Sequence, residues 1–233
     1  RGWNPLITES ELLNAIVKQG KHFGNSKLGV DVAGEGRNDS VIIRRSEGFA
    51  EIKLKDNEID TTSLAAEALA LKVELEEPIQ ISPVSTIIPY IEIAIDKIGV
   101  GLGPFQTLKK QTDKIRGVVG GAIASDTITY FNKRAENYWR VREWILAGGK
   151  LIKDGDLQDK SNKYGSWKQL LDIKYKINAD KKVQIISKDL LREAGVESPD
   201  IPDALANTFE TKDIEMKAEG TATVANKKRE THI

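Results

Sequence analysis

Aspartates near the ends of predicted strands and helices are the residues of this sequence best suited to chemistry. Cysteine is absent, and histidine occurs only twice, at His22 and His232. This composition excludes disulfides, thiolate metal sites and thiol nucleophiles, and it argues against a catalytic triad or a histidine zinc helix. Chemistry in this chain would therefore fall to carboxylates, acting alone or through hard cations.

Two aspartates lie in or next to apolar segments of the kind that form buried strands. Asp31 lies within the segment 28–33, and Asp96 directly follows the segment 91–95. If a helical crossover brings the second strand parallel to the first, the two carboxylates lie side by side, about 4.8 Å apart. Two ionised carboxylates at that spacing repel each other, and a divalent cation relieves the repulsion. A pair of cations about 3.5–4 Å apart is the arrangement used for in-line phosphodiester displacement.

A third acid is expected from a helix near the end of the chain. Asp203 is the candidate, with Asp200 one helical turn before it. Carboxylate ligands favour Mg²⁺ or Mn²⁺. Each acid also has a structural explanation, because a strand-end aspartate forms turns, Asp200 can cap the helix, and Asp203 favours its positive end. Taken together the acids favour metal ligation, because an unpaired charge is costly in or beside the apolar segments of Asp31 and Asp96.

The elements that must position these acids form a mixed α/β pattern. Three strands at 28–33, 40–45 and 49–54, joined by tight turns, are expected to form an antiparallel meander. The remaining elements follow in chain order: a helix over 61–77 stopped by Pro78, a strand at 91–95, a glycine-rich turn at 99–103, a short helix, a strand near 115–119, a long helix over 132–147, a hairpin of 174–177 and 183–186, a helix over 187–194, and a last helix ending near Phe209. A further amphipathic helix, capped by Thr8 or Ser10, is expected over 11–18.

Overall composition narrows the class of protein without naming a partner. The chain has 233 residues, of which 39% are hydrophobic and 30% charged, and its formal net charge is zero. A nucleic-acid surface would therefore have to be a local patch. No apolar run reaches the roughly 18 residues of a membrane span, and no secretion signal is present, so we expect neither membrane insertion nor secretion. The chain begins at Arg1 and its only methionine is Met216, so we expect it to be a piece of a longer protein.

Several short segments occur in a characteristic order and at characteristic distances along the chain. They are Leu28 to Gly34 with Asp39 to Val41, Ile95-Asp96 with Gly99 to Gly101, Tyr130 to Glu136, Ile186 to Lys188, and Ser198 to Leu205 with Thr208-Phe209. Together they resemble the C-terminal nuclease domain of the large terminase subunit of tailed bacteriophages. The resemblance runs from about Leu28 to Phe209, and its most specific part is the element Ser-Pro-Asp-Ile-Pro-Asp-Ala-Leu.

This resemblance implies a ribonuclease H-like fold and a metal-dependent endonuclease. The activity implied is two-metal hydrolysis that cuts concatemeric double-stranded DNA for packaging, with two divalent cations, Mg²⁺ or Mn²⁺, as cofactors. It implies Asp31, Asp96 and Asp203 as catalytic metal ligands and Asp200 as an accessory ligand. After the glycine turn, Pro104-Phe105 stands where many members of the family carry an acid.

The resemblance also implies an organisation and a set of partners. It makes 28–210 the nuclease domain. From the residues themselves, 1–27 are expected to be a lead-in helix and linker, and 211–233 a polar, mobile tail, because the chain beyond Glu210 is charged and poor in large apolar residues. The partners would be double-stranded DNA, an N-terminal ATPase domain of the same full-length protein, the portal and the small terminase subunit, in the cytoplasm of the infected host cell. No G-x-x-x-x-G-K-[ST] motif occurs, so this chain does not contain the phosphate loop of that ATPase.

Lysines in the second half of the chain are the candidates for contact with DNA. We expect phosphate contacts from the hairpin and the helix after it, by Lys174, Lys176, Lys181, Lys182 and Lys188. The alternative is a solvated face, with Lys188 as an ordinary lysine at a helix start. The arginines and tryptophans of the helix 132–147 are expected to serve packing rather than nucleic-acid stacking.

Three other functions remain open at the level of sequence. A different ribonuclease H-like enzyme, such as a Holliday-junction resolvase, would share the acids but not the Ser-Pro-Asp-Ile-Pro-Asp-Ala-Leu element. A non-enzymatic actin-like nucleotide-binding module would use the glycine turn at 99–103 to hold phosphates. A structural portal-docking or scaffolding piece is the third alternative.

Overall fold

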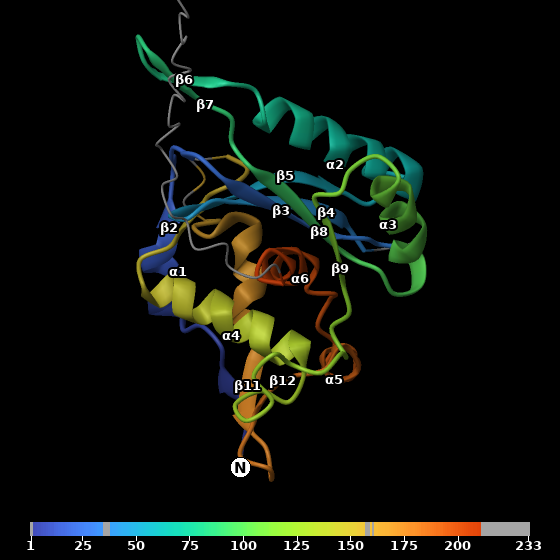
Figure 1. Ribbon diagram of the computed structural model, residues 1–233. Helices are drawn as coiled ribbons and strands as arrows, with labels where there is room; N and C mark the ends of the chain where they lie inside the picture. Colours follow the sequence, from blue (N-terminus) through green and yellow to red (C-terminus); the bar gives the residue numbers. More distant parts are fainter. Residues whose placement is uncertain (1, 35–37, 157–158, 160, 211–233) are drawn as a thin grey trace, which may run out of the picture.

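The meander predicted at 28–54 forms the centre of a seven-stranded sheet (Figure 1). The structure is a computed structural model that describes residues 2–34, 38–156, 159 and 161–210. The antiparallel strands of the meander are β3 (Ser26–Asp31), β4 (Ser40–Arg45) and β5 (Phe49–Asp56). Because the connections between them are short, consecutive strands of the meander pair with each other, and they do so antiparallel.

Parallel strands extend the meander on both sides. The strand order is β2-β10-β5-β4-β3-β8-β9. On one side β8 (Ile91–Asp96) pairs parallel with β3, and β9 (Ile115–Val118) pairs parallel with β8. On the other side β10 (Lys150–Ile152) pairs parallel with β5, and β2 (Ile16–Val17) with β10. The predicted mixed sheet is therefore confirmed, and its first and fourth predicted strands are neighbours.

Helices cover both faces of the sheet (Figure 1). The α-helices are α1 (Glu9–Ala15), α2 (Thr61–Leu75), α3 (Leu102–Lys109), α4 (Lys133–Leu146), α5 (Lys188–Glu193) and α6 (Asp200–Asn207), and the 3-10 helices are η1 (Gly99–Gly101) and η2 (Gly165–Asp172). In Figure 1, α2 and α3 lie above the sheet, and α1, α4 and α6 lie below it. Local sequence sets several helix starts: Thr8 and Glu11 form a capping box on α1, and the Asp60 side chain caps α2.

The period of two along the strands decides which side chains reach which helices. Leu28 and Val30 of β3 pack in the core beneath α2, together with Ile93 of β8. The alternate residues of β3 and β8, which include Asp31 and Asp96, point to the opposite face, where α6 lies. On the α2 face these strands carry Leu, Val and Ile, whereas on the α6 face Gly29 and Ala94 are small and Asp31 and Asp96 are acids.

The first residues of the described chain pack on the same core. Leu6, Ile7 and Leu12 are fully buried with residues of α4 and η2. Strand β1 (Asn4–Pro5) pairs with β11 (Lys174–Ile177), and β11 pairs with β12 (Val183–Ile185), so the predicted hairpin becomes a three-stranded sheet. The predicted domain limits stay predictions, and the predicted tail at 211–233 lies outside the described residues.

A second hairpin, β6 (Ile79–Ser82) and β7 (Ser85–Ile87), was not predicted. It extends from the body of the molecule (Figure 1) and exposes Ile81 and Val84 at its tip. Within the residues that the structure describes, no helix is long and apolar enough to cross a membrane.

Candidate metal centre

Three of the predicted acids meet in one small cavity. A cavity of about 60 Å³ is lined by Asp31 of β3, Asp96 of β8 and Asp203 of α6. Val30 and Ile95 are paired in the sheet, so the next residues, Asp31 and Asp96, lie side by side at the ends of parallel neighbours. The adjacency predicted for the two strands is therefore observed, and α6 adds the third acid from the facing layer.

Close packing of α6 on β3 places Asp203 over the strand ends. A Cβ atom on Gly29 would overlap the carbonyl oxygen of Ala204, so only glycine allows α6 to approach this closely. Asn207 Nδ2 then donates a hydrogen bond of 2.9 Å to the carbonyl oxygen of Val30. The helix is thus fixed to the same strand that carries Asp31.

Asp203 is held by side chains from α4 and α5. Its Oδ1 accepts a 2.5 Å hydrogen bond from the Tyr138 hydroxyl and a longer one, 3.4 Å, from Arg134 Nη2. Its Oδ2 lies 2.8 Å from Lys188 Nζ, in an ion pair that is not aligned as a hydrogen bond. Burial raises the pKa of Asp203, but the charges of Arg134 and Lys188 and the Tyr138 hydroxyl outweigh burial and lower it. Asp203 therefore keeps its charge.

The pKa values of Asp31 and Asp96 are shifted in the opposite direction. Burial raises the pKa of Asp31 well above its usual range, and the charges of Asp203, Asp200 and Asp96 raise it further against the effect of Lys188. Burial likewise raises the pKa of Asp96, although the Ile98 N–H donates to Asp96 Oδ1. Asp96 therefore also has the turn-forming role expected of a strand-end aspartate. Burial first, and repulsion from the neighbouring carboxylates second, therefore favour the protonated form of Asp31.

Asp200 lies beside this cavity but in a different one. It is buried, and its Oδ2 accepts a 2.9 Å hydrogen bond from the Asp39 N–H, which ties α6 to the loop after β3. Asp200 and Asp31 both line a larger cavity of about 600 Å³. The capping role considered for Asp200 is wrong, because α6 begins at Asp200 itself and Pro199 occupies the capping position.

The donor set fits hard divalent cations. Oxygen ligands from three elements face one cavity, their charges repel each other, and Asp203 Oδ2 is buried without a hydrogen bond. In their present conformations, however, no group of three or more acidic or histidine side chains among the described residues is placed to hold a metal ion. Lys188 supplies the positive charge instead, so cation binding would require its ammonium group to move away from Asp203.

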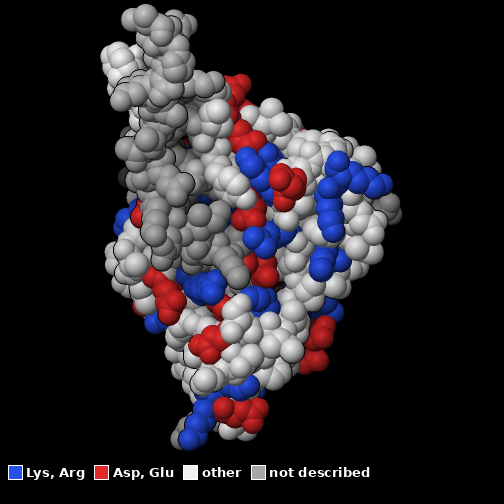
Figure 2. Space-filling model, viewed as in Figure 1, with Lys and Arg blue, Asp and Glu red and all other residues white. Residues whose placement is uncertain are grey.

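The predicted DNA-binding lysines divide into two groups. Lys188 begins α5 and its side chain is 41% exposed, as expected for a lysine at a helix start, but it also lines the acid cavity and pairs with Asp203. Lys174 and Lys176 lie on β11, and Lys181 and Lys182 lie in the turn before β12. In Figure 2, lysines and arginines also form a band over the side where α3 lies, while acidic and basic groups alternate in the middle of this face.

Two residues of α4 were not recognised as parts of the site. Arg134 and Tyr138, four residues apart, lie on one face of the helix and both contact Asp203. We expected the arginines of this helix to serve packing. The available signal was that Arg134 lies within the segment Tyr130 to Glu136, which already carried the family resemblance, with Tyr138 one helical turn further on.

The sheet and its acids define a fold class. A three-stranded antiparallel meander followed by parallel strands, with acids on the first and fourth strands and on a helix of the facing layer, is the ribonuclease H-like nuclease fold. No protein-family model and no curated protein matches the sequence.

Solved structures with the same fold are nuclease domains of phage large terminase subunits. The nuclease domain of the large terminase subunit gp2 of bacterial virus Sf6 superposes with a TM-score of 0.68 at 16% identity, over 90% of this chain and 100% of that one. A lysine-to-alanine variant of that domain, with manganese, gives a TM-score of 0.66 at the same identity and coverage. The large terminase nuclease of thermophilic phage G20c, with bound cobalt, gives 0.54 at 15% identity, over 87% and 95% of the two chains. The predicted structural resemblance is confirmed.

Proposed function

We propose that this chain is the nuclease domain of a viral DNA-packaging terminase and that it cuts double-stranded DNA with the help of divalent cations. The observation that carries the proposal is the cavity in which Asp31, Asp96 and Asp203 meet. The similar Sf6 and G20c domains are nucleases, and metal ions are named in the structures of both. The low identity shows the shared fold alone, so the activity of this chain rests on its own acids.

The residues that would hold the metal are Asp31, Asp96 and Asp203, with Asp200 at the edge. Two cations, Mg²⁺ or Mn²⁺, would supply an activated water and charge stabilisation for the leaving 3′ oxygen. Tyr138 and Arg134 fix the orientation of Asp203, and burial raises the pKa of the Tyr138 hydroxyl, which keeps it a donor. Hydrogen bonds of this kind to a ligand carboxylate set the direction of its oxygens.

Lys188 is suited to balance charge at the substrate. Burial alone lowers the pKa of Lys188, but the charges of Asp203 and Asp31 outweigh it and raise that pKa above its usual value. The ammonium group therefore stays charged at working pH. Once displaced from Asp203, it can contact a phosphate oxygen of the bound strand.

Binding by the domain alone would be weak, sensitive to salt and largely indifferent to sequence. Lysine contacts to phosphate position a duplex but carry no sequence information. We propose the hairpin lysines Lys174, Lys176, Lys181 and Lys182 for this role. The wider setting we propose comprises an ATPase domain of the same full-length protein, the portal and the small terminase subunit, in the cytoplasm of the infected host cell.

A plasmid-nicking assay tests the proposed activity. Supercoiled DNA is incubated with the protein and Mn²⁺, Mg²⁺ or chelator, and we expect cutting with Mn²⁺, slower cutting with Mg²⁺ and none with chelator. Asp31→Ala, Asp96→Ala and Asp203→Ala should each abolish cutting, while the control Asp113→Ala, at an exposed aspartate, should cut normally. Circular dichroism verifies that each variant is folded. Unchanged cutting by the three site variants would remove the proposed site.

A further inference from the structure

The loop between β9 and α4 exposes three large apolar side chains beside the acid cavity. Ile123, Ile128 and Phe131 are 80%, 85% and 50% exposed. Scattered apolar residues on a surface need no explanation. Phe131 differs from the two isoleucines because its side chain lines a cavity of about 230 Å³.

That cavity, the Phe131 cavity, adjoins the acid cavity. Arg134 and Lys188 line both of them. The other walls of the Phe131 cavity include Ile185 and Gln184 of β12. The cavity therefore combines an aromatic ring, an aliphatic wall and an amide, and two cations stand where it meets the carboxylates.

Backbone hydrogen bonds fix the main chain that carries Phe131. The Phe131 N–H donates a 2.9 Å hydrogen bond to the Val183 carbonyl oxygen, and the Asn132 side chain caps α4 by accepting from the Ala135 N–H. Only the two side-chain torsions of Phe131 then remain to be restricted when a planar base stacks on its ring, so the entropy cost of stacking is small.

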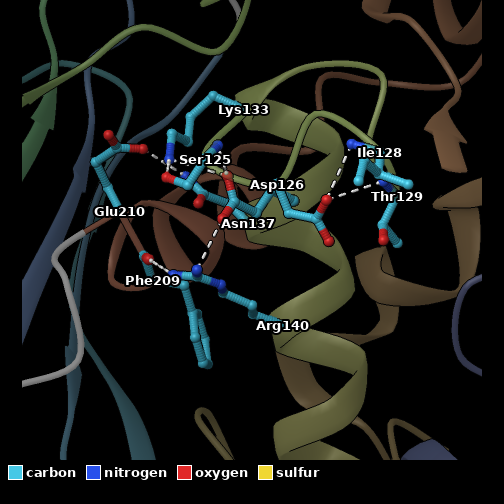
Figure 3. Close-up of polar contacts among 10 residues, drawn as sticks. Ser125, Asp126, Ile128, Thr129, Lys133, Asn137, Arg140, Phe209 and Glu210 are labelled. Atoms are coloured by element: carbon cyan, nitrogen blue, oxygen red, sulfur yellow. Dashed lines mark hydrogen bonds and ion pairs between the residues drawn. The ribbon is translucent and has the colours of Figure 1, made fainter. Parts of the chain in front are cut away.

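The preceding loop is tied to α4 by a buried carboxylate (Figure 3). Glu136 accepts hydrogen bonds from the Ser125 N–H at 2.7 Å and from Lys133 Nζ at 2.9 Å. Asp126 accepts from the Ile128 and Thr129 N–H groups and closes the turn within the loop. The segment that leads to Phe131 is therefore shaped before any ligand arrives.

Charge favours this side of the acid cavity for a nucleotide. The larger cavity on the other side is lined by two cations, Lys188 and Arg192, but also by four acids that would repel a phosphate: Asp31, Asp39, Glu197 and Asp200. The Phe131 cavity contains no acidic residue among its lining residues, which include Arg134 and Lys188. A phosphate held near the acids would leave its neighbouring nucleoside within this cavity.

We infer that the Phe131 cavity is a subsite for one unpaired nucleotide of the DNA strand next to the cutting position. Its base stacks on Phe131 against Ile185, and its phosphate faces Arg134 and Lys188. This inference rests on the proposed nuclease function and adds to it that the duplex opens locally beside the acids, because both faces of a base inside a continuous duplex are covered by its neighbours and the base must leave the stack to enter the cavity.

Oligonucleotide binding without cutting tests the subsite. Fluorescein-labelled single-stranded oligonucleotides are titrated with the protein in buffer that contains a metal chelator, and fluorescence anisotropy gives the dissociation constant. Phe131→Leu keeps an apolar side chain but removes the ring, and we expect binding to weaken by about 5- to 150-fold, the range for loss of one base–aromatic stack. Phe131→Trp should restore binding. Ile128→Ala, at an exposed isoleucine of the same loop outside the cavity, should leave binding unchanged.

Single abasic substitutions along the oligonucleotide identify the stacked base. One position should weaken binding to the unaltered protein, and the same substitution should have no effect on Phe131→Leu. An equal abasic profile in both proteins, or full binding by Phe131→Leu, would overturn the subsite. If the unaltered protein still cuts plasmid with Mn²⁺ in that case, the proposed function stands; if it neither binds nor cuts, both conclusions fall.

Discussion

Replacing Tyr138 by phenylalanine removes one hydroxyl group and leaves the buried ring in place. That hydroxyl donates the 2.5 Å hydrogen bond to Asp203 Oδ1, and the remaining contact of this oxygen is the 3.4 Å one from Arg134. A hydrogen bond to a buried charged group contributes about 1.5–3 kcal/mol. For a domain of this size, where 1 kcal/mol corresponds to about 2–4 °C, we expect the Tm of the metal-free protein to fall by about 3–12 °C at pH 7.

The dependence of this loss on pH follows from Asp203. Burial raises the pKa of Asp203, but the Arg134 and Lys188 charges and the Tyr138 hydroxyl lower it overall. A carboxyl group whose pKa is lower in the folded state contributes stability above its unfolded pKa, about 3.9, and loses it as the pH falls through the folded value. The difference in Tm between Tyr138→Phe and the unaltered protein should therefore be full at pH 7 and shrink below about pH 4.

Calorimetry in chelator measures the stability difference, and titration with Mn²⁺ measures the effect on the metal site. Loss of a second-shell partner typically weakens metal binding by about 10- to 100-fold. Tyr164→Phe is a matched control, because the Tyr164 hydroxyl donates at the same 2.5 Å to Glu9, whose side chain is 66% exposed. We expect little change in Tm and none in Mn²⁺ affinity for the control. Equal losses in both variants, or unchanged Mn²⁺ affinity in Tyr138→Phe, would refute the positioning role.

Three further predictions concern charge. Burial and the neighbouring acids raise the pKa of Asp31, so its ionisation destabilises the folded state above that raised pKa, and this destabilisation vanishes as the pH falls toward about 3.9. Asp31→Asn should therefore raise the Tm of the metal-free protein at pH 8.5 and raise it much less at pH 4.5, as measured in thermal melts. A gain in Tm that is independent of pH would contradict this. Lys188→Met removes the ammonium group 2.8 Å from Asp203 and should tighten Mn²⁺ binding by about tenfold in calorimetric titration, whereas weaker binding would show that the lysine does not compete with the metal. Combining Lys181→Glu with Lys182→Glu should reduce the slope of log K for DNA binding against log salt concentration by the contribution of up to about two phosphate contacts. An unchanged slope would show that the DNA does not contact these lysines.

Hydrophobic periodicity predicted five of the seven strands of the sheet and placed the three acids in or next to elements with a clear local signal. It missed β10, and it placed Ile16–Val17 of β2 in the predicted helix over 11–18. Strand β3 reads as buried, β8 ends at Asp96, and α6 begins within a short characteristic element. The contacts of Asp203 with α4 were not predictable, because they join elements far apart in the chain. The hairpin of β6 and β7 was missed because prolines at positions 78, 83 and 89 interrupt its strand pattern.

The participation of residues 4–17 in the core was also unpredicted. Leu12 belongs to the predicted amphipathic helix and Leu6 precedes it, but the sequence does not show which part of the protein buries these two side chains. The pairing of Asn4 with Tyr175 depends on a partner far along the chain. Local sequence patterns therefore predicted individual helices and strands, whereas contacts between residues far apart in the chain determine where residues 4–17 pack.

The glycine at position 29 allows α6 to rest directly on β3, and this makes the final helix indispensable to the pocket. During synthesis on the ribosome, the strands that bear Asp31 and Asp96 emerge long before the helix that bears Asp203. A nascent polypeptide lacking that helix has neither the third acid nor the wall that carries it. Under the proposed function, a copy that terminates before α6 would therefore be unable to cut DNA.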